Sequence, residues 1–283
     1  MALLSSELVK ITNLQLASKL VSEELMLGIH ASKRYGYGIE FEQYRHYEIG
    51  DDPKRIDWKL FARTQKHLVR ESSTESNYHI RFVLDLSGSM NYTEEGVSRL
   101  QYCKILLASI AYMGFRQGDQ LSLYVLKDNQ VHTLVASGKQ AFQRILYALE
   151  KAEASGKWTS DTKSFPVFQQ KQKEILFFAS DLLQLDNEWI QLLKKLANPR
   201  REIYVFQVLG QHELDFDLKG FYRFKDLETG QEVELQAEQI KAEVKANAES
   251  FLSQIESNLK VPFVYWKKIS LKDPIAGIIR EIL

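Results

Sequence analysis

The chain has 283 residues, of which 45% are hydrophobic and 26% are charged, a balance typical of a globular protein and not of a disordered or fibrous one. Its 37 basic and 37 acidic side chains give a formal net charge of zero, so no overall field attracts nucleic acid or anionic lipid. The single cysteine, Cys103, excludes an internal disulfide framework and a multi-thiolate metal site, which favours a reducing, cytoplasmic compartment.

Residues 1–30 predict one amphipathic helix. Glu7 and Lys10 interrupt its apolar residues, so the segment lacks the continuous apolar core of a secretory signal. The longest strongly apolar stretch, residues 105–115, falls short of the ~20 residues that a membrane-spanning helix needs, and we expect no membrane segment. The helical spacing comes from apolar residues at steps of three or four: Leu8, Ile11, Leu14, Ala17, Val21 and Leu25.

Residues 31–76 are expected to form a small separate module. Residues 36–75 are rich in charged and aromatic side chains and contain no long periodic run. A second short piece, within residues 212–238, predicts a β insertion around the turn Glu228-Thr229-Gly230. Each piece is too short to bury much surface alone, so we expect the two to pack together.

Residues 77–283 predict a three-layer α/β domain, interrupted by that insertion. Alternation of strands with helices implies a mainly parallel sheet that helices cover on both faces. A hairpin return is expected at residues 131–135, after a polar turn. The expected strands are residues 79–86, 121–126, 175–180, 203–209 and 263–269, and the expected helices are residues 100–113, 142–149, 189–196 and 240–259.

Two of the expected strands end in aspartate, at Asp85 and Asp181. In an open α/β sheet, ligands gather at the carboxyl ends of the strands. The run Asp85-x-Ser87-x-Ser89 places three short oxygen-bearing side chains at alternating positions, which can direct all three to one side. Hydroxyls with one or two carboxylates suit Mg²⁺, so the pattern predicts a magnesium site. The alternative is structural: the serines cap a helix and the aspartate accepts backbone hydrogen bonds.

The same run, followed by a helix and by a later strand that ends in aspartate, resembles the metal-ion-dependent adhesion site of von Willebrand A domains. The resemblance implies a Rossmann-like fold, Mg²⁺ or Mn²⁺ as the bound ion, and a partner protein whose carboxylate completes the coordination. The family also supplies a threonine from the loop between the two strands. The candidates here are Thr159 and Thr162, and we favour Thr162 because Phe165, Val167 and Phe168 follow it closely.

The preceding module resembles the signature of domain-of-unknown-function family 58, a bacterial and archaeal group with a von Willebrand A-like domain. The similar residues are Gly-Tyr-Gly-Ile-Glu-Phe at 36–41, a charged run at 45–58, Ala62-Arg63 and a tail at 226–230. Members are often encoded near MoxR-type AAA+ ATPases, which implies an adaptor or substrate-presenting role in a chaperone-like system. Many members carry hydrophobic segments before this module, and we see none here.

The charged run of the module has two interpretations. In the first, its ion pairs fix the module against the sheet, with Trp58 as an apolar anchor. In the second, the same residues form a docking surface for the ATPase. The residues concerned are Arg45, Asp51, Asp52, Arg55, Asp57, Trp58 and Arg63.

A metal-dependent hydrolase or phosphatase is the main alternative function, but we expect no catalytic residue. The Asp85-x-Ser87 pair lacks the second aspartate of an aspartyl-phosphate phosphatase. The sequence contains no Gly-x-Ser-x-Gly elbow, no phosphate-binding Gly-x-x-x-x-Gly-Lys-Ser/Thr loop and no His-Glu-x-x-His zinc spacing among its 6 histidines. A structural scaffold with a vestigial metal site is the third hypothesis.

Overall fold

The computed structural model describes residues 5–8, 11, 13–31, 43–47, 56, 58–71, 78–128, 130–155, 173–183, 187–217, 220–227 and 230–282. The chain divides into two compact units. One comprises Met1–Gly28 with Asn77–Leu283, and the other is Ile29–Ser76. The expected packing of the charged module on the β insertion would join these two units, and it stays a prediction.

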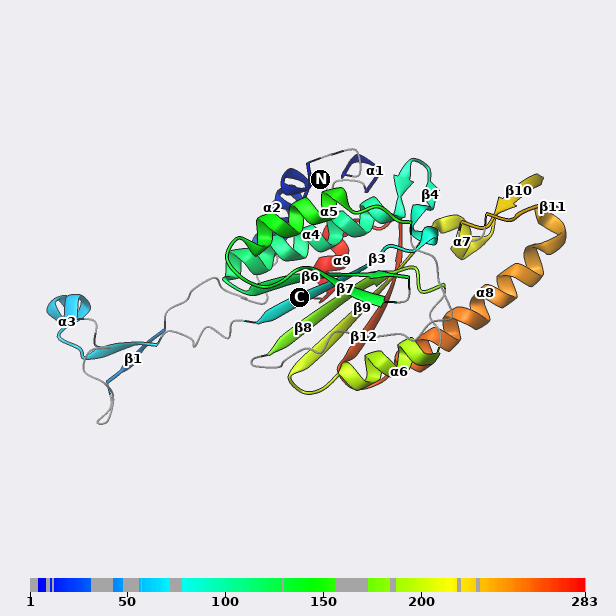
Figure 1. Ribbon diagram of the computed structural model, residues 1–283. Coiled ribbons are helices and arrows are strands. Elements are labelled where there is room, and N and C mark those ends of the chain that lie inside the picture. Colours follow the sequence, from blue (N-terminus) through cyan, green and yellow to red (C-terminus); the bar gives the residue numbers. More distant parts are fainter. Residues whose placement is uncertain are drawn as a thin grey trace. The chain divides into compact units, whose positions relative to one another are not determined.

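The first unit is built on a six-stranded sheet with the strand order β12-β9-β8-β3-β6-β7 (Figure 1). Neighbouring strands run parallel except for the β6–β7 pair at one edge, which forms the expected hairpin. The predicted mainly parallel sheet is confirmed. Its strands are β3 (His79–Asp85), β6 (Gln120–Lys127), β7 (Gln130–Val135), β8 (Glu174–Ser180), β9 (Arg201–Leu209) and β12 (Val264–Ser270).

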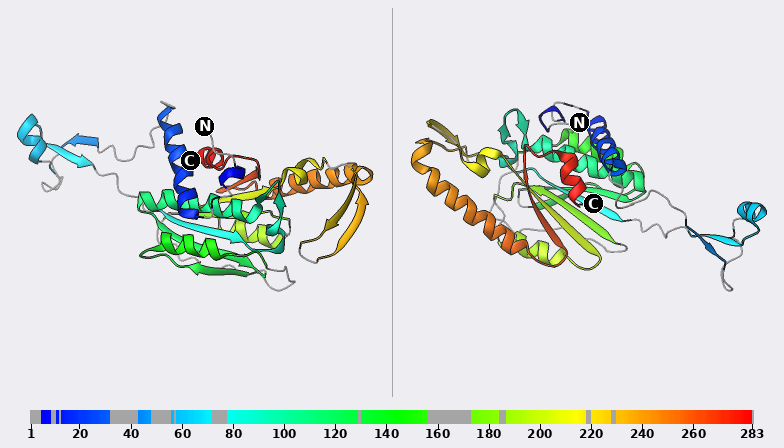
Figure 2. Two further views of the ribbon diagram at one scale, coloured as in Figure 1. Left: turned by 90° about the horizontal axis from the view of Figure 1, so that it is seen from above. Right: turned by 180° about the vertical axis from the view of Figure 1, so that it is seen from behind.

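Helices cover both faces of this sheet, which confirms the three-layer α/β architecture (Figures 1 and 2). Successive strand side chains point to opposite faces, so Phe82 and Leu84 enter one hydrophobic core and Val83 enters the other. The first core contains side chains of α2 (Leu14–Ala31), α4 (Arg99–Gln117), α5 (Ala141–Lys151) and α9 (Ile275–Ile282), and the second those of α6 (Asn187–Leu196) and α8 (Ala237–Leu259).

The N-terminal segment forms two helices, α1 (Ser5–Leu8) and α2, so the prediction of a single helix is wrong. The side chain of Asn13 accepts a hydrogen bond of 2.9 Å from the backbone N–H of Leu16, which starts a new helix at this point. Leu8 and Val21 are both buried in the first core. Within the described residues, no helix is long and apolar enough to cross a membrane.

Several short elements surround the carboxyl end of the sheet. The expected β insertion is an antiparallel hairpin of β10 (Phe221–Lys225) and β11 (Glu232–Gln236). The sequence pattern did not predict three of these short elements, namely the 3-10 helix η2 (Gly88–Asn91), the hairpin of β4 (Thr93–Glu94) and β5 (Val97–Ser98), and the helix α7 (Gln211–Asp215). It also did not predict the helix α9.

The second unit contains an antiparallel pair of strands and a short helix. Strand β1 (Gln43–His46) pairs with β2 (Leu68–Glu71), and α3 (Trp58–Thr64) lies between them in sequence. The ring of Trp58 packs edge-on against Phe61, with 6.0 Å between the ring centroids. The unit is therefore more regular than the charge-rich sequence indicated.

Candidate metal centre

The sheet brings together the ends of β3 and β8, which are neighbouring parallel strands. The hydroxyl of Ser180, the last residue of β8, donates a hydrogen bond of 2.6 Å to Asp85 Oδ2. Asp181 follows directly, and the side chains of Asp85 and Asp181 interact electrostatically. Both residues are almost fully buried. Two carboxylates far apart in sequence therefore share one small volume at the carboxyl edge of the sheet.

The loop after Asp85 places two hydroxyls beside this carboxylate. The backbone N–H of Ser87 donates to Asp85 Oδ1 over 2.8 Å, and the hydroxyl oxygens of Ser87 and Ser89 lie 3.1 Å apart. The 3-10 helix η2 begins at Gly88, so a turn and not continued strand alternation carries Ser89 to this position. Adjacent ligands of an octahedral Mg²⁺ are about 3.0 Å apart, because each lies about 2.1 Å from the ion. The hydroxyl pair fits that spacing.

The capping alternative for the two serines is not what the structure contains. Ser87 precedes η2 but makes no side-chain capping hydrogen bond. The N-cap of α4 is Ser98, whose hydroxyl accepts a hydrogen bond from the backbone N–H of Gln101. The part of the alternative that concerns Asp85 is correct, since this carboxylate does accept a backbone N–H. The roles of Asp85, Ser87, Ser89 and Asp181 as metal ligands stay a prediction.

The charge state of Asp85 reflects its crowded position. Burial and the neighbouring Asp181 raise the pKa of the Asp85 carboxyl to about 7, although hydrogen bonds from Ser180 and Ser87 act in the opposite direction. A buried pair of carboxylates favours any cation that neutralises it. Within the described part of the chain, no three His, Cys, Asp or Glu side chains are grouped as metal ligands, so carboxylates alone do not make up a cage.

An arginine that the sequence analysis did not single out lies against this pair. Arg99 is almost fully buried, and its Nη1 donates to Asp181 Oδ2 over 2.6 Å and to the Ser89 carbonyl oxygen over 3.0 Å. Its Nη2 forms an ion pair with Glu213 of α7. Burial alone would lower the pKa of Arg99, but the carboxylates of Asp181 and Glu213 raise it overall. The arginine is thus a permanent cation beside the candidate site.

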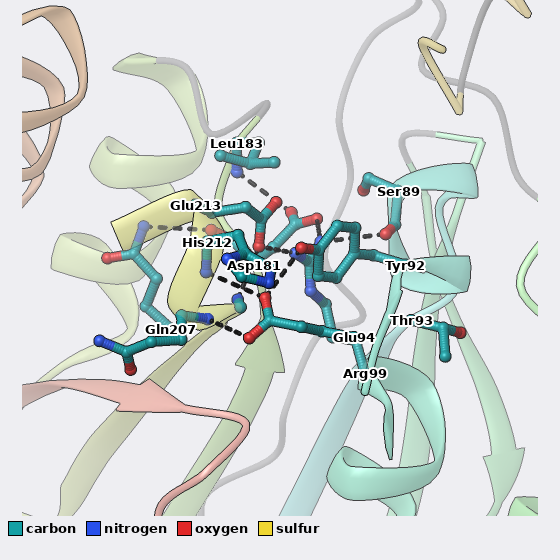
Figure 3. A network of polar contacts seen from close by, with 12 residues as sticks. Ser89, Tyr92, Thr93, Glu94, Arg99, Asp181, Leu183, Gln207, His212 and Glu213 are labelled. Atoms are coloured by element: carbon teal, nitrogen blue, oxygen red, sulfur yellow. Dashed lines mark hydrogen bonds and ion pairs between the residues drawn. The ribbon is translucent and has the colours of Figure 1, made fainter. Parts of the chain in front are cut away.

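The network continues from Arg99 to the β4–β5 hairpin (Figure 3). The guanidinium lies 4.7 Å from the centre of the Tyr92 ring, and the Tyr92 hydroxyl donates to Glu94. The carboxylate of Glu94 also accepts the backbone N–H groups of Gln211 and His212, each over 3.0 Å. Glu94 therefore satisfies the first amide groups of α7 and ties this helix to the hairpin.

The remaining predicted residues divide between described and undescribed parts of the chain. Thr159 and Thr162 lie outside the described residues, so neither choice of loop ligand is tested. In the second unit, Arg45 belongs to β1 and Arg63 to the last turn of α3. The other charged residues of the candidate set lie outside the described part: Asp51, Asp52, Arg55 and Asp57.

The only signal for Arg99 in the sequence is a cation in the first turn of a helix, where the helix dipole favours acidic residues. Glu213 gives only the weak signal of an acidic residue in the first turn of a helix, and that helix has five residues, none of them buried. Both residues acquire their roles through partners far away in sequence, which a local pattern does not reveal.

Comparison with known proteins gives one family and several distant relatives. The family described as "Protein of unknown function DUF58" matches residues 43–251. Uncharacterized proteins of Mycobacterium bovis and Mycobacterium tuberculosis are each 23% identical over 225 residues, covering 77% of this chain and 69% of theirs. Similar solved structures include the conserved hypothetical protein BatB from Bacteroides thetaiotaomicron, with a TM-score of 0.45, 12% identity and coverage of 72% and 96%. The VWA domain of SpRpn10 gives a TM-score of 0.41 at 11% identity, with coverage of 71% and 93%.

Proposed function

This chain belongs to the DUF58 family, and on that premise we propose that it is a metal-ion-dependent protein-binding module. The observation that supports the proposal most is the pair of hydroxyl oxygens, on Ser87 and Ser89, 3.1 Å apart beside the Asp85 carboxylate. Their spacing suits neighbouring ligands of an octahedral cation, and their place is where α/β sheets bind ligands.

In this proposal Asp85, Ser87 and Ser89 bind Mg²⁺ or Mn²⁺. Asp181 and a loop threonine, Thr162 or Thr159, are the remaining protein ligands. When bound, the ion supplies an electrophilic position for an acidic side chain of a partner protein. The protein contributes two carboxylates and neutral hydroxyls, so the ion keeps part of its charge for that partner. Ser180 holds the Asp85 carboxylate in place through its 2.6 Å hydrogen bond.

The partner that we propose is a MoxR-type AAA+ ATPase or the client protein that it remodels. The support for this partner is the resemblance of the module before the sheet to the DUF58 signature, because members of that group are often encoded beside such ATPases. The formal net charge of zero favours recognition through a local site and not through a general field. The chain would then serve as an adaptor that presents clients.

A metal-dependent hydrolase is less well supported by the side chains near the site. Cys103 is fully buried, and burial raises the pKa of its thiol far above the ordinary value, which keeps it from acting as a thiolate nucleophile. His79 begins β3, at the opposite end of the strand from Asp85, and burial lowers its pKa to about 4. Cys103 is thus held as a thiol and His79 lies away from the candidate centre, so neither group serves there as nucleophile or base.

The test is the replacement Asp85→Ala. We expect it to abolish Mg²⁺ binding in calorimetric titrations and to weaken retention of the ATPase by about tenfold or more, ~1.4 kcal/mol, while circular dichroism stays unchanged. Folding should persist because the apolar strands and helices, and not this carboxylate, provide most of the buried surface.

The matched control is Glu256→Ala, which removes one acidic charge from an exposed position of α8. It should leave both Mg²⁺ binding and partner retention unchanged. If partner affinity is the same in Asp85→Ala and also insensitive to chelation in the unmodified protein, the chain is a structural scaffold whose metal site is vestigial.

A further inference from the structure

Arg99 places a fixed positive charge inside the centre that the proposed function assigns to a divalent ion. Its side chain is 1% exposed, and it touches three segments: η2 through the Ser89 carbonyl, the residue after β8 through Asp181 and α7 through Glu213. Among the described residues, its Nε is a buried donor without a hydrogen-bond partner. The hydrogen bonds and ion pairs of the guanidinium are thus made by its two Nη groups and not by Nε.

Both carboxylate oxygens of Asp181 accept hydrogen bonds from groups of the protein itself. Oδ1 accepts the backbone N–H of Leu183 over 3.1 Å, and Oδ2 accepts Nη1 of Arg99 over 2.6 Å. A divalent ion that drew on Oδ2 would have to share it with the guanidinium or displace the guanidinium from it. Two cations at one oxygen repel each other strongly in a buried site, where water does not screen them.

We propose that Arg99 is a resident counter-cation that competes with the divalent ion for Asp181 and so weakens the affinity of the site for that ion. This inference rests on the proposed function, because it concerns the same centre. In the metal-free protein Arg99 neutralises the carboxylate of Asp181. A divalent ion that binds Asp181 must weaken or replace this ion pair.

Glu213 gives Arg99 a second ion-pair partner, so that Asp181 can turn toward a divalent ion without leaving Arg99 unpaired. When Asp181 turns toward a divalent ion, Arg99 keeps its ion pair with Glu213 and is not left as an unpaired buried charge, which would be costly. Glu213 is in turn fixed, because its carboxylate accepts the backbone N–H of Gly210 over 2.6 Å. The second anchor therefore lets the arginine remain in place in both states of the site.

A purely structural ion pair would lead to a different expectation. If Arg99 only held Asp181 in the correct position, its removal would leave the carboxylate misplaced and weaken metal binding. If Arg99 competes with the ion, its removal strengthens metal binding even while it lowers the stability of the fold. The sign of the change in Mg²⁺ affinity separates the two roles.

The experiment compares Arg99→Gln with the unmodified full chain in Mg²⁺ titrations followed by calorimetry. We expect the dissociation constant to fall by about fivefold or more when the competing charge is removed. Arg99→Lys keeps the charge and should stay within about twofold of the unmodified protein, since a single ammonium still pairs with Asp181.

The matched control is Arg116→Gln, which makes the same charge change at an exposed position of the same helix, α4. The two arginines are 17 residues apart on α4, which corresponds to about 25 Å, well beyond the Debye length in ordinary buffers. This variant should bind Mg²⁺ as the unmodified chain does.

Each pattern of binding has one meaning. Tighter binding by Arg99→Gln supports the inference, and equal or weaker binding overturns it while the proposed function stands. Binding by Arg99→Gln alone, with none by the unmodified chain, supports the inference and overturns metal dependence of the natural protein. Absence of binding in both overturns both. Equal tightening in Arg99→Lys and Arg99→Gln overturns competition by charge.

Arg99→Gln leaves Asp181 and Glu213 without their ion-pair partner and could therefore misfold. A second variant tests the inference with fewer unpaired charges. The double change Arg99→Gln with Glu213→Gln removes both members of one ion pair, and the same tightening is expected. The unmodified protein gives a third readout, because the Nη protons of Arg99 should shift in nuclear magnetic resonance spectra as Mg²⁺ saturates the site. Saturation without any change in these signals overturns the inference.

Discussion

The Asp85 carboxyl lies buried beside Asp181, and these two conditions raise its pKa to about 7. In an unfolded chain the same carboxyl has its ordinary pKa of about 3.9. The folded state therefore holds this proton more tightly than the unfolded state. The resulting contribution to stability is fully present below pH 4 and is lost as the pH rises through 7.

Asp85→Asn should consequently stabilise the metal-free protein at pH 8 by about 2 to 4 kcal/mol, because the amide carries no charge that burial penalises. At pH 4 the gain should largely disappear, since the unmodified carboxyl is then neutral as well. Urea unfolding in the presence of a chelator at the two pH values measures the difference.

Saturating Mg²⁺ provides the internal control for this experiment. At pH 8 the ion should reverse the order of stability, since it stabilises only the protein that binds it. An equal effect of Asp85→Asn at both pH values would contradict the assigned charge state of Asp85.

The sequence allowed some residues of the site to be predicted and hid others. Asp85, Ser87 and Ser89 form a local motif at the end of an apolar strand, so their place at the carboxyl edge of the sheet was predictable, although the turn of η2 and not strand alternation positions Ser89. Arg99 reaches Asp181 across 82 positions and Glu213 across 114, and no short-range pattern encodes contacts of that kind. Local chemistry was predictable, whereas its neutralising partner was not.

At the scale of elements, the turn between β9 and α7 brings the main chain of Gly210 very close to the side chains of Glu94 and Tyr92. A Cβ atom at Gly210 would lie 2.4 Å from Glu94 Oε2 and 2.5 Å from a ring carbon of Tyr92. Glycine thus lets the end of β9 reach the β4–β5 hairpin, where Glu94 binds the first amides of α7.

Gly210→Ala should destabilise the protein by about 1 to 3 kcal/mol, because the new methyl group displaces Glu94 and Tyr92 from α7. Gly277→Ala is the matched control. It lies within α9 with no atom within 4 Å of a new Cβ, so it should be neutral or stabilising by up to about 1 kcal/mol. Thermal unfolding of both variants measures the contrast, and equal effects would refute the steric role of Gly210.

Long elements were predictable because their apolar runs are long, and short elements were not. The strand expected at residues 203–209 is β9, Arg201–Leu209, and the helix expected at residues 142–149 is α5, Ala141–Lys151. Two-residue strands such as β4 and β5 are too short for any periodicity. The side chain of Asn13 caps the start of α2 by accepting the backbone N–H of Leu16. The apolar residues keep their helical spacing across this point, so their pattern did not reveal the break between α1 and α2.

At the scale of the whole molecule, the core of the first unit is assembled from distant parts of the sequence. Helix α2 buries Val21 completely in the core that α4, α5 and α9 share, whereas Leu16 of the same helix is 50% exposed. The chain then passes through the second unit, Ile29–Ser76, before it returns as β3. The N-terminal helix is therefore an integral part of the domain that follows the module.

Val21→Asp should destabilise the protein by about 4 kcal/mol or more, because it leaves an unpaired charge in an apolar core. Leu16→Asp places the same side chain on the exposed face of the same helix and should change stability by less than about 0.5 kcal/mol. Urea unfolding followed by tryptophan fluorescence compares the two. Similar effects of both changes would show that α2 contributes little to the core.

The neighbouring position of β3 and β8 also has a kinetic consequence. The contact between Ser180 and Asp85 spans 95 residues, so the candidate metal centre forms only after a large loop has closed and the two strands have paired. If the centre binds Mg²⁺ as proposed, an incompletely folded chain offers the ion only separate halves of that site. Added Mg²⁺ would therefore leave the refolding rate unchanged and lengthen the lifetime of the native state.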